Sequence, residues 1–272
     1  FDGMIEVSHT TSYGLYFALR GNVTFARNKI IEDDTAEALW SYQNTRGTRV
    51  GQPFGYVALG LFQSQEEIDS SPKQELGSYT VGDVKYKDIN EDGVINAYDK
   101  VPIGYARTPE VMFGFGGTIA YKGFDLTVNF TGAGNTSTFF DSEGMWPFQL
   151  DYPGYNVVHE YFDNRFIPGG DSERNARAKY PVVHNGTSSN NYQASTLYQR
   201  DASYIKLKTA EIGYNFPKRI YAKMGLGGLR VFVNGNNLLC FDDLKVIDPE
   251  SNYGTGGYPT QRALTLGIQA TF

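Results

Sequence analysis

The sequence predicts an all-β protein whose antiparallel strands form a segment of a transmembrane β-barrel with long extracellular loops. Three observations indicate this fold class. Long stretches alternate apolar residues with small or polar ones at period two, as strands with one apolar face do. The connections between these stretches are alternately short and long. Aromatic residues make up 15% of the 272 residues and glycine occurs 31 times, which suits strands and turns better than helices.

The N-terminal half contains five of roughly eight expected strands. The opening "GMIEVSHT" is a weaker strand candidate, and "GLYFALRGNVTFARN" alternates along its whole length. The stretch "FGYVALGLF", residues 54 to 62, is again weaker. The clearest pair is "VMFGFGGTIAY" and "FDLTVNFTG", which flank Lys122 and Gly123. Two alternating runs around a glycine-containing pair predict a β-hairpin.

Three further strands follow in the C-terminal half. "SYIKLKTAEIGYNF" places Ile205 and Leu207 on one parity but Ile212 and Tyr214 on the other, which predicts a bulge near Lys208 and Thr209. "LRVFVNGNNLLCF" and "ALTLGIQATF" complete the set.

The connections fall into two classes that take turns along the chain. Residues 122–123 and 217–228 are short, residues 63–110, 133–202 and 241–262 are long, and residues 29–53 are intermediate and fit the short side least well. Long loops at one end and short turns at the other are typical of an antiparallel outer-membrane barrel. A soluble β-sandwich also alternates, but the polar faces here are poor in Lys and Glu, which favours the barrel.

Bulk composition excludes several classes of protein. The net charge of −6 and the pI of about 5.2 argue against a nucleic-acid partner. The single cysteine, Cys240, excludes an intrachain disulfide and is expected to be a small buried or lipid-facing hydrophobe. No stretch approaches the ~18–20 apolar residues that a spanning helix requires, whereas a spanning strand needs only ~9–11 alternating residues. The opening "FDGMIEV" has no initiator Met and reads as a fragment or a mature piece.

A loop with calcium-ligand spacing lies at "DINEDGVINAYD", residues 88 to 99. Gly93 supplies the tight turn of such a loop. The candidate ligands at positions 1, 3, 5, 7, 9 and 12 are Asp88, Asn90, Asp92, the carbonyl of Val94, Asn96 and Asp99. Asp99 replaces the usual bidentate Glu and no amphipathic helices flank the loop, so an EF-hand pair is not expected. The prediction is one structural calcium ion, and the alternative is a solvated turn capped by its own Asx side chains.

The sequence predicts no enzyme and no catalytic residue. It contains no nucleophile elbow, phosphate-binding loop or zinc-protease motif. The three histidines, His9, His159 and His184, lie far apart in unrelated contexts.

One long loop is rich in aromatic residues beside carboxylates and amides. Flat rings next to such groups suit recognition of sugars or peptides. The candidate substrate-binding residues are Phe139, Phe140, Trp146, Tyr152 and Tyr155, with Phe148 between them. The alternative is a loop whose aromatic residues form a small core of their own.

The last strand ends on an aromatic residue, Phe272, after strict alternation from Leu264. Such a strand would close a barrel against lipid, whereas in a soluble sandwich it would be an ordinary edge strand.

Several motifs, in this order and spacing, resemble the C-terminal portion of SusC/RagA-type TonB-linked outer-membrane proteins. They are "GLFQSQEEID", "GDVKYKDINEDGVINAYDKVPIG", "YKGFDLTVNFTG", "RDASYIKLKTAEIGYNFPK", "LRVFVNGNNLLCF" and "YPTQRALTLGIQATF". The opening also resembles a mid-barrel hairpin of that family, so the resemblance covers nearly the whole chain, residues 1–272.

The resemblance implies import of oligosaccharides or peptides across the outer membrane by a lipid-embedded barrel. It implies a SusD-like surface lipoprotein as partner, energy from TonB, and Phe272 as a signal for the barrel-assembly machinery. The TonB box, the plug and the first strands of such a barrel are absent from this sequence, since about 22 strands are needed.

Two alternatives stay open at this point. One is a secreted, calcium-binding β-sandwich that binds glycans, and the other is a free-standing barrel of eight strands that acts as an enzyme or adhesin.

Overall fold

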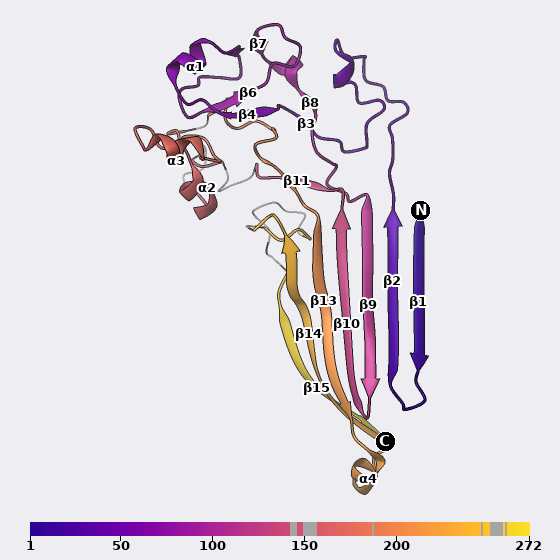
Figure 1. The fold of residues 1–272 in the computed structure, drawn as a ribbon. Coiled ribbons are helices and arrows are strands. Elements are labelled where there is room, and N and C mark those ends of the chain that lie inside the picture. Colours follow the sequence, from indigo (N-terminus) through magenta and orange to yellow (C-terminus); the bar gives the residue numbers. More distant parts are fainter. Residues whose placement is uncertain (142–145, 149–156, 187, 246, 251–257, 259) are drawn as a thin grey trace.

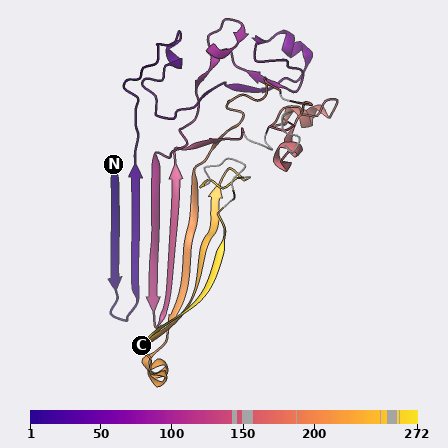
Figure 2. The same cartoon turned by 180° about the vertical axis from the view of Figure 1, so that it is seen from behind.

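The structure, a computed structural model, describes residues 1–141, 146–148, 157–186, 188–245, 247–250, 258 and 260–272. One seven-stranded antiparallel sheet dominates it, in the order β1-β2-β9-β10-β13-β14-β15 (Figures 1 and 2). Its strands are β1 (Asp2–Thr10), β2 (Tyr16–Phe25), β9 (Val111–Tyr121), β10 (Phe124–Gly134), β13 (Tyr204–Asn215), β14 (Gly228–Asp242) and β15 (Ala263–Thr271). The all-β, antiparallel prediction is therefore confirmed.

Local sequence explains the turns and the irregularities of this sheet. The β9–β10 hairpin turns through Lys122 at φ 48° and Gly123 at φ 91°, the left-handed pair that two-residue hairpins need. The predicted bulge is confirmed, because the register of β13 skips Lys208 against both of its neighbours. The extra residue keeps Leu207 on the apolar face while Thr209 lies on the polar face.

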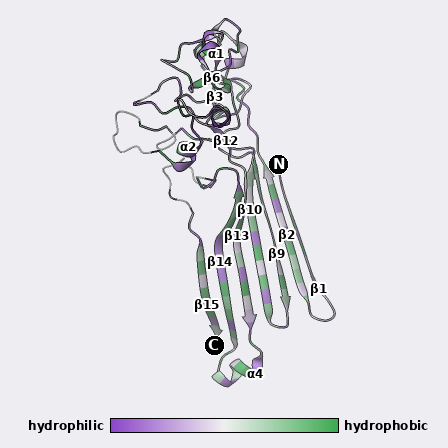
Figure 3. Cartoon of the chain, turned by 60° about the vertical axis from the view of Figure 1, so that its left-hand side comes forward, coloured by the Kyte–Doolittle hydropathy of each residue, from purple (hydrophilic) through white to green (hydrophobic). Residues whose placement is uncertain are grey.

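The alternation gives the sheet one apolar and one polar face. Large side chains of the apolar face lie outside any protein core, among them Ile5 at 68%, Ile119 at 55% and Leu266 at 73% exposure. Figure 3 shows the resulting change between hydrophobic and hydrophilic residues along each strand. Among the described residues no second sheet packs on the apolar face, which is the arrangement expected of a barrel wall rather than of a β-sandwich.

Side chains on the polar face lie flat across neighbouring strands. The Arg20 guanidinium on β2 crosses β9 and donates to Asn129 Oδ1 on β10 at 2.6 and 3.2 Å, and Asn129 donates to Thr209 Oγ1 at 2.8 Å. The strand between is crossed at Gly116, where a Cβ would collide with Asn129 and with the backbone carbonyl of Val128. Glycine at this position therefore leaves space for the side chains that link β2 to β10.

A second crossing lies nearer the short turns. Arg230 on β14 reaches over Gly213 on β13 and pairs with Asp125 on β10 at 2.5 Å. The same guanidinium pairs with Glu211 at 2.7 Å, which in turn accepts from Asn234. Three strands of the polar face, β10, β13 and β14, are thus tied by charge-assisted hydrogen bonds.

The connections alternate between the two ends of the sheet, as the sequence predicts, with one correction. Residues 29–53 lie on the long-loop side, in one excursion with residues 63–110. The stretch 54–62 is not a strand of the large sheet, because it divides into β3 (Phe54–Gly55) and β4 (Ala58–Leu61), which pair with other short strands of that excursion. The large sheet consequently has seven strands where roughly eight are expected.

The described residues of 26–110 and 135–203, here named the loop cap, fold above the long-loop end of the sheet (Figure 1). Besides β3 and β4 the cap contains η1 (Ser41–Gln43), α1 (Gln65–Asp69), β5 (Lys73–Gln74), β6 (Val84–Tyr86), β7 (Val94–Ile95), η2 (Ala97–Asp99), β8 (Val101–Pro102), β11 (Ser137–Phe139), α2 (His159–Asn164), α3 (Ser172–Ala176) and β12 (Gln199–Asp201). At the opposite end, α4 (Lys218–Tyr221) and η3 (Ala222–Met224) form the β13–β14 turn. No helix among the described residues is long and apolar enough to cross a membrane.

Candidate functional site

The loop cap is held together by two apolar cores that join segments far apart in the sequence. The first core consists of Tyr56, Leu61, Val84, Tyr86, Ile95, Phe166 and Val182. Buried amides support it: Gln74 donates to the carbonyl of Val84 at 2.9 Å and to Asn190 Oδ1 at 2.7 Å. The excursion after β2 is therefore packed against the excursion after β10, and the cap is one folded body above the sheet.

The second core contains two of the aromatic residues predicted to bind substrate. Phe140 is 2% exposed and packs with Tyr161, Tyr180 and Tyr198, while the Arg200 guanidinium lies 5.0 Å from its ring. Trp146 stacks on Tyr192 at 5.3 Å and meets the Tyr198 ring edge-on at 5.9 Å. Both side chains thus form part of the loop's own core, which is the arrangement of the alternative interpretation.

The other predicted substrate residues lie differently. Phe139 is half-buried at the end of β11, and Phe148 is 44% exposed on the cap surface. Tyr152 and Tyr155 lie outside the described residues. Of the described aromatic residues between 139 and 156, Phe148 is the one most open to a ligand.

The predicted calcium loop forms a closed turn through its own side chains. Asp88 accepts from the backbone N–H groups of Glu91 and Gly93 at 2.7 and 2.8 Å. Asp92 Oδ1 accepts from the N–H of Val94 at 2.9 Å. These are Asx-type contacts that close the turn without a metal ion.

Asp99 closes the loop from its far end. It is fully buried and accepts from the N–H groups of Ile89 at 2.7 Å and Asn96 at 2.8 Å, while Asn96 caps η2 through the N–H of Tyr98. Among the described residues no three His, Cys, Asp or Glu side chains converge as a metal-binding group.

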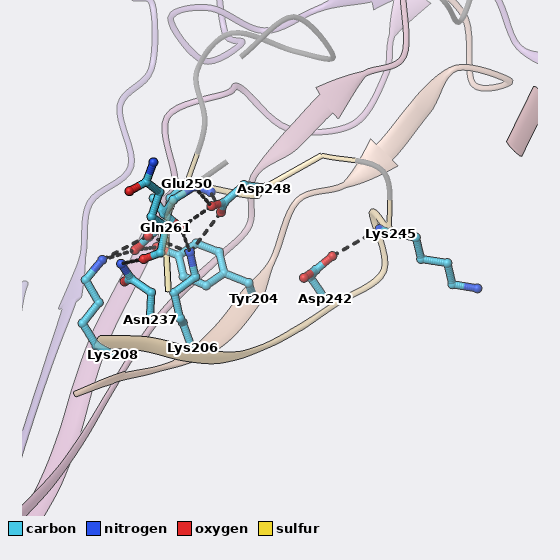
Figure 4. A network of polar contacts seen from close by, with 10 residues as sticks. Tyr204, Lys206, Lys208, Asn237, Asp242, Lys245, Asp248, Glu250 and Gln261 are labelled. Carbon is cyan, nitrogen blue, oxygen red and sulfur yellow. Dashed lines mark hydrogen bonds and ion pairs between the residues drawn. The ribbon is translucent and has the colours of Figure 1, made fainter. Parts of the chain in front are cut away.

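A network of ion pairs and hydrogen bonds at the long-loop end of the sheet holds residues of the connection after β14 against the polar face (Figure 4). The Lys206 ammonium on β13 is 3% exposed and donates to Asp248 at 3.0 Å, Glu250 at 2.7 Å and Thr260 at 3.0 Å. Lys208 reaches the same Glu250 at 3.1 Å from a more open position. Burial raises the pKa of Asp248, but hydrogen bonds from Thr260 and Lys206 outweigh it and bring that pKa to about 2.

A similar carboxylate ties the cap to the top of β9. Glu110 is 6% exposed, pairs with Arg27 at 2.7 Å and also with Arg49, and accepts from Asn135. The hydrogen bond from Arg27, with those from Arg49 and Asn135, outweighs burial and lowers the pKa of Glu110 to about 2. Neither this cluster nor the Lys206 network was predicted from sequence. The partners of Glu110 lie 25 to 83 residues from it along the chain. The partners of Lys206 lie 42 to 54 residues from it.

Of the three histidines, His184 has a defined partner. It lies 2.6 Å from the fully buried carboxylate of Asp83, which also accepts from Asn191. His184 lines a hollow of about 750 Å³ on the cap, together with Phe166, Gly169 and Ser172. His9 lies on β1 against Phe17, and His159 begins α2, so the structure brings no two histidines together as a catalytic pair.

The alternating sheet, its bare apolar face and the large cap on one side are features shared with known outer-membrane proteins. No family model matches the chain. TonB-dependent receptor P26 of Formosa agariphila is 32% identical over 272 residues, covering 90% of this chain and 26% of the receptor. TonB-dependent receptor P3 of the same organism is 26% identical, covering 83% of this chain and 22% of the receptor. These matches identify the chain as part of a TonB-dependent receptor.

Solved structures agree in fold. The RagAB peptide transporter superimposes with a TM-score of 0.68 at 17% identity, over 100% of this chain and 29% of the transporter chain. The RagAB peptide importer in its open-open state gives 0.67 at 18% identity. The chain thus spans about a quarter of the length of the receptors it matches. The predicted family, fold and location in the outer membrane are confirmed, and these relatives are receptors and transporters by name rather than enzymes.

The Lys206 network generates a stability prediction. We expect Lys206→Gln to release residues 247–250, because it leaves two carboxylates without their buried cation, at a cost of roughly 3 kcal/mol. Hydrogen exchange of this segment in the full-length protein measures the effect. Lys208→Gln is the matched control: its side chain is 39% exposed, so the cost should stay below about 1 kcal/mol. Equal protection in both variants would contradict the assigned role of Lys206.

Proposed function

We propose that the chain, residues 1–272, is the C-terminal barrel segment of an outer-membrane nutrient importer. The observation that carries this proposal is a sheet with one uncovered apolar face and with a folded cap at its long-loop end. In hydrocarbon an unpaired strand edge leaves backbone N–H and C=O groups unsatisfied, at several kcal/mol each. The free edges of β1 and β15 therefore require partner strands, which the rest of a longer polypeptide would supply.

The proposed cargo is an oligosaccharide or a peptide, and the proposed cap partner is a SusD-like surface lipoprotein. Two features support the cap as the contact region: it stands over the long-loop end of the sheet, and it exposes large apolar side chains such as Leu59 at 57% and Phe148 at 44%. The peptide transport named for the RagAB structures favours peptides among the two cargo classes.

The proposed energy source is TonB, acting on parts of the receptor other than these 272 residues. The described residues contribute binding surfaces and a wall. Their strongest polar clusters, around Arg230, Lys206 and Glu110, consist of mutually paired charges, which suits a structural role better than acid–base catalysis.

The cargo-binding proposal predicts a loss of uptake when further candidate rings of the aromatic loop are removed. We expect the triple variant Phe148→Ala, Tyr152→Ala and Tyr155→Ala to lose roughly 1–3 kcal/mol of binding free energy. Peptide or oligosaccharide uptake, or lipoprotein co-purification, should then fall about fivefold or more. Phe140 and Trp146 are left in place because they pack in the cap core.

Phe162→Ala is the matched control, since this ring on α2 is 47% exposed and lies outside residues 139–156, which hold the candidate rings. Normal uptake and co-purification in the triple variant would show that the loop is not the contact site.

We further propose that one calcium ion stiffens the loop of residues 88–99. Support comes from the ligand spacing and from the closed turn in which Asp99 returns to the N–H of Ile89. The proposed ligands are Asp88, Asn90, Asp92, the carbonyl of Val94, Asn96 and Asp99.

The calcium proposal predicts a charge-specific loss of binding. Asp92→Asn should weaken calcium binding about tenfold or more in calorimetry of the full-length protein, because it removes an anionic ligand. Glu91→Gln removes the same charge at loop position 4, which is not a ligand position, and should change the affinity less than about twofold. An absence of calcium-dependent heat in the parent protein would end the proposal.

Phe272 is proposed as an assembly signal and not as a packing residue. Its ring is 96% exposed and follows the last paired residue of β15. We expect its deletion to lower the amount of receptor in the outer membrane severalfold while assembled barrels keep their heat stability. The control Phe241→Ala removes another exposed ring of the apolar face, at 61%, and should leave the amount unchanged. Normal amounts with reduced stability after deletion would instead indicate packing.

A further inference from the structure

The short-turn end of the sheet carries a concentration of positive charge that the cargo and cap proposals do not use. This end consists of three turns, residues 11–15, 122–123 and 216–227. They contain Lys122, Lys218, Arg219 and Lys223 and no Asp or Glu. Since the whole chain has a net charge of −6, the remainder has −6 − 4, or −10. Four of the 24 Lys and Arg residues thus lie in turns that contain no acidic residue, at one end of an acidic protein.

Local acidic groups do not neutralise this charge. Asp125, the nearest carboxylate on the strands, is already paired with Arg230 and accepts from Asn215. Phe272 lies beside Gly227, and even with its carboxylate counted the short-turn end stays positive. The basic residues of α4 and η3 are all exposed and make no ion pair with a described residue.

A row of aromatic rings marks where this end meets the membrane surface. On the apolar face, the ring centroids of Phe124 and Tyr214 lie 4.5 Å apart, and those of Tyr214 and Phe216 lie 5.0 Å apart. Tyr13 of the first turn meets Tyr121 edge-on at 6.4 Å. Aromatic girdles of this kind lie at the level of the lipid headgroups. The Lys122 ammonium lies 5.0 Å from the Tyr121 ring, directly at this girdle.

The α4–η3 segment continues from the girdle and is itself two-sided. Figures 1 and 3 show it beyond the ends of β13 and β14, on the side of the short turns. Ile220 and Met224, 40% and 63% exposed, are one turn apart, as are Arg219 and Lys223. Exposed apolar side chains next to basic ones are the composition with which short amphipathic segments bind the interface of an anionic membrane.

We propose that this basic rim, comprising Lys122, Lys218, Arg219 and Lys223, binds anionic phospholipid headgroups of the periplasmic leaflet. Short turns of outer-membrane barrels face the periplasm, which places the rim at that leaflet. Basic residues at a membrane surface select anionic over zwitterionic headgroups. The girdle fixes the depth of the barrel, and the rim holds the lipid that surrounds it.

The test is native mass spectrometry of the full-length protein in detergent, with equal amounts of phosphatidylglycerol and phosphatidylcholine of the same acyl chains. The parent should bind phosphatidylglycerol preferentially. The triple variant K218Q/R219Q/K223Q should lose about tenfold or more of this preference. The charge-matched control K87Q/K179Q/K245Q removes three exposed charges on the long-loop side and should keep it.

Each other outcome overturns the proposal. An unchanged preference in the triple variant would exclude the rim, and an equal loss in the control would reduce the effect to overall charge. Lys122→Asn, which suits the left-handed turn and leaves α4 intact, should show a smaller loss; it decides the matter if the triple variant fails to fold. Normal nutrient uptake without lipid preference would reject this inference and leave the importer proposal standing.

Discussion

Backbone groups in hydrocarbon find no water, so the hydrogen-bond ladder between neighbouring strands is the constraint on which this structure depends. The inner strands, from β2 to β14, are paired on both sides except at the bulge around Lys208 and in the last part of β14, where the pairing with β15 ends at Asn236. The ladder fixes every side chain to one face or the other, which is why a change of one residue in register requires a bulge. It also sends successive connections to opposite ends, so that a cap forms on one side and tight turns on the other.

The polar face shows how a thin wall accommodates long charged side chains. Gly116 and Gly213 leave gaps through which Arg20 and Arg230 lie flat and reach partners two strands away. Each guanidinium meets its acceptors on the sheet itself, so its charge is satisfied there. These side-chain hydrogen bonds add to the backbone hydrogen bonds that join the strands. A buried cation is satisfied in a similar way at the long-loop end, where Lys206 pairs with two carboxylates of the connection after β14.

How much of the structure could be predicted from the sequence depended on how far apart along the chain the interacting residues lie. The strands, the hairpin at Lys122 and the bulge at Lys208 follow from alternation within ten or so residues, and they were predicted correctly. The stretch 54–62 alternates in the same way but pairs within the cap, because its partners are contributed by residues 84–86 and 101–102. Likewise, nothing local distinguishes a buried Phe140 from an exposed Phe148: the difference comes from packing against tyrosines up to 58 residues away.

Net charge is a poor guide to a protein whose two ends meet different surroundings. The value of −6 argues against nucleic acid, and it conceals an end at which all the charged side chains of the turns are basic. Charges on the wall and at the mouth are largely paired within the protein, whereas those of α4 and the β9–β10 turn face outward. Unpaired charge is therefore retained where headgroups and solvent can solvate it, and it is neutralised internally where the surrounding protein cannot.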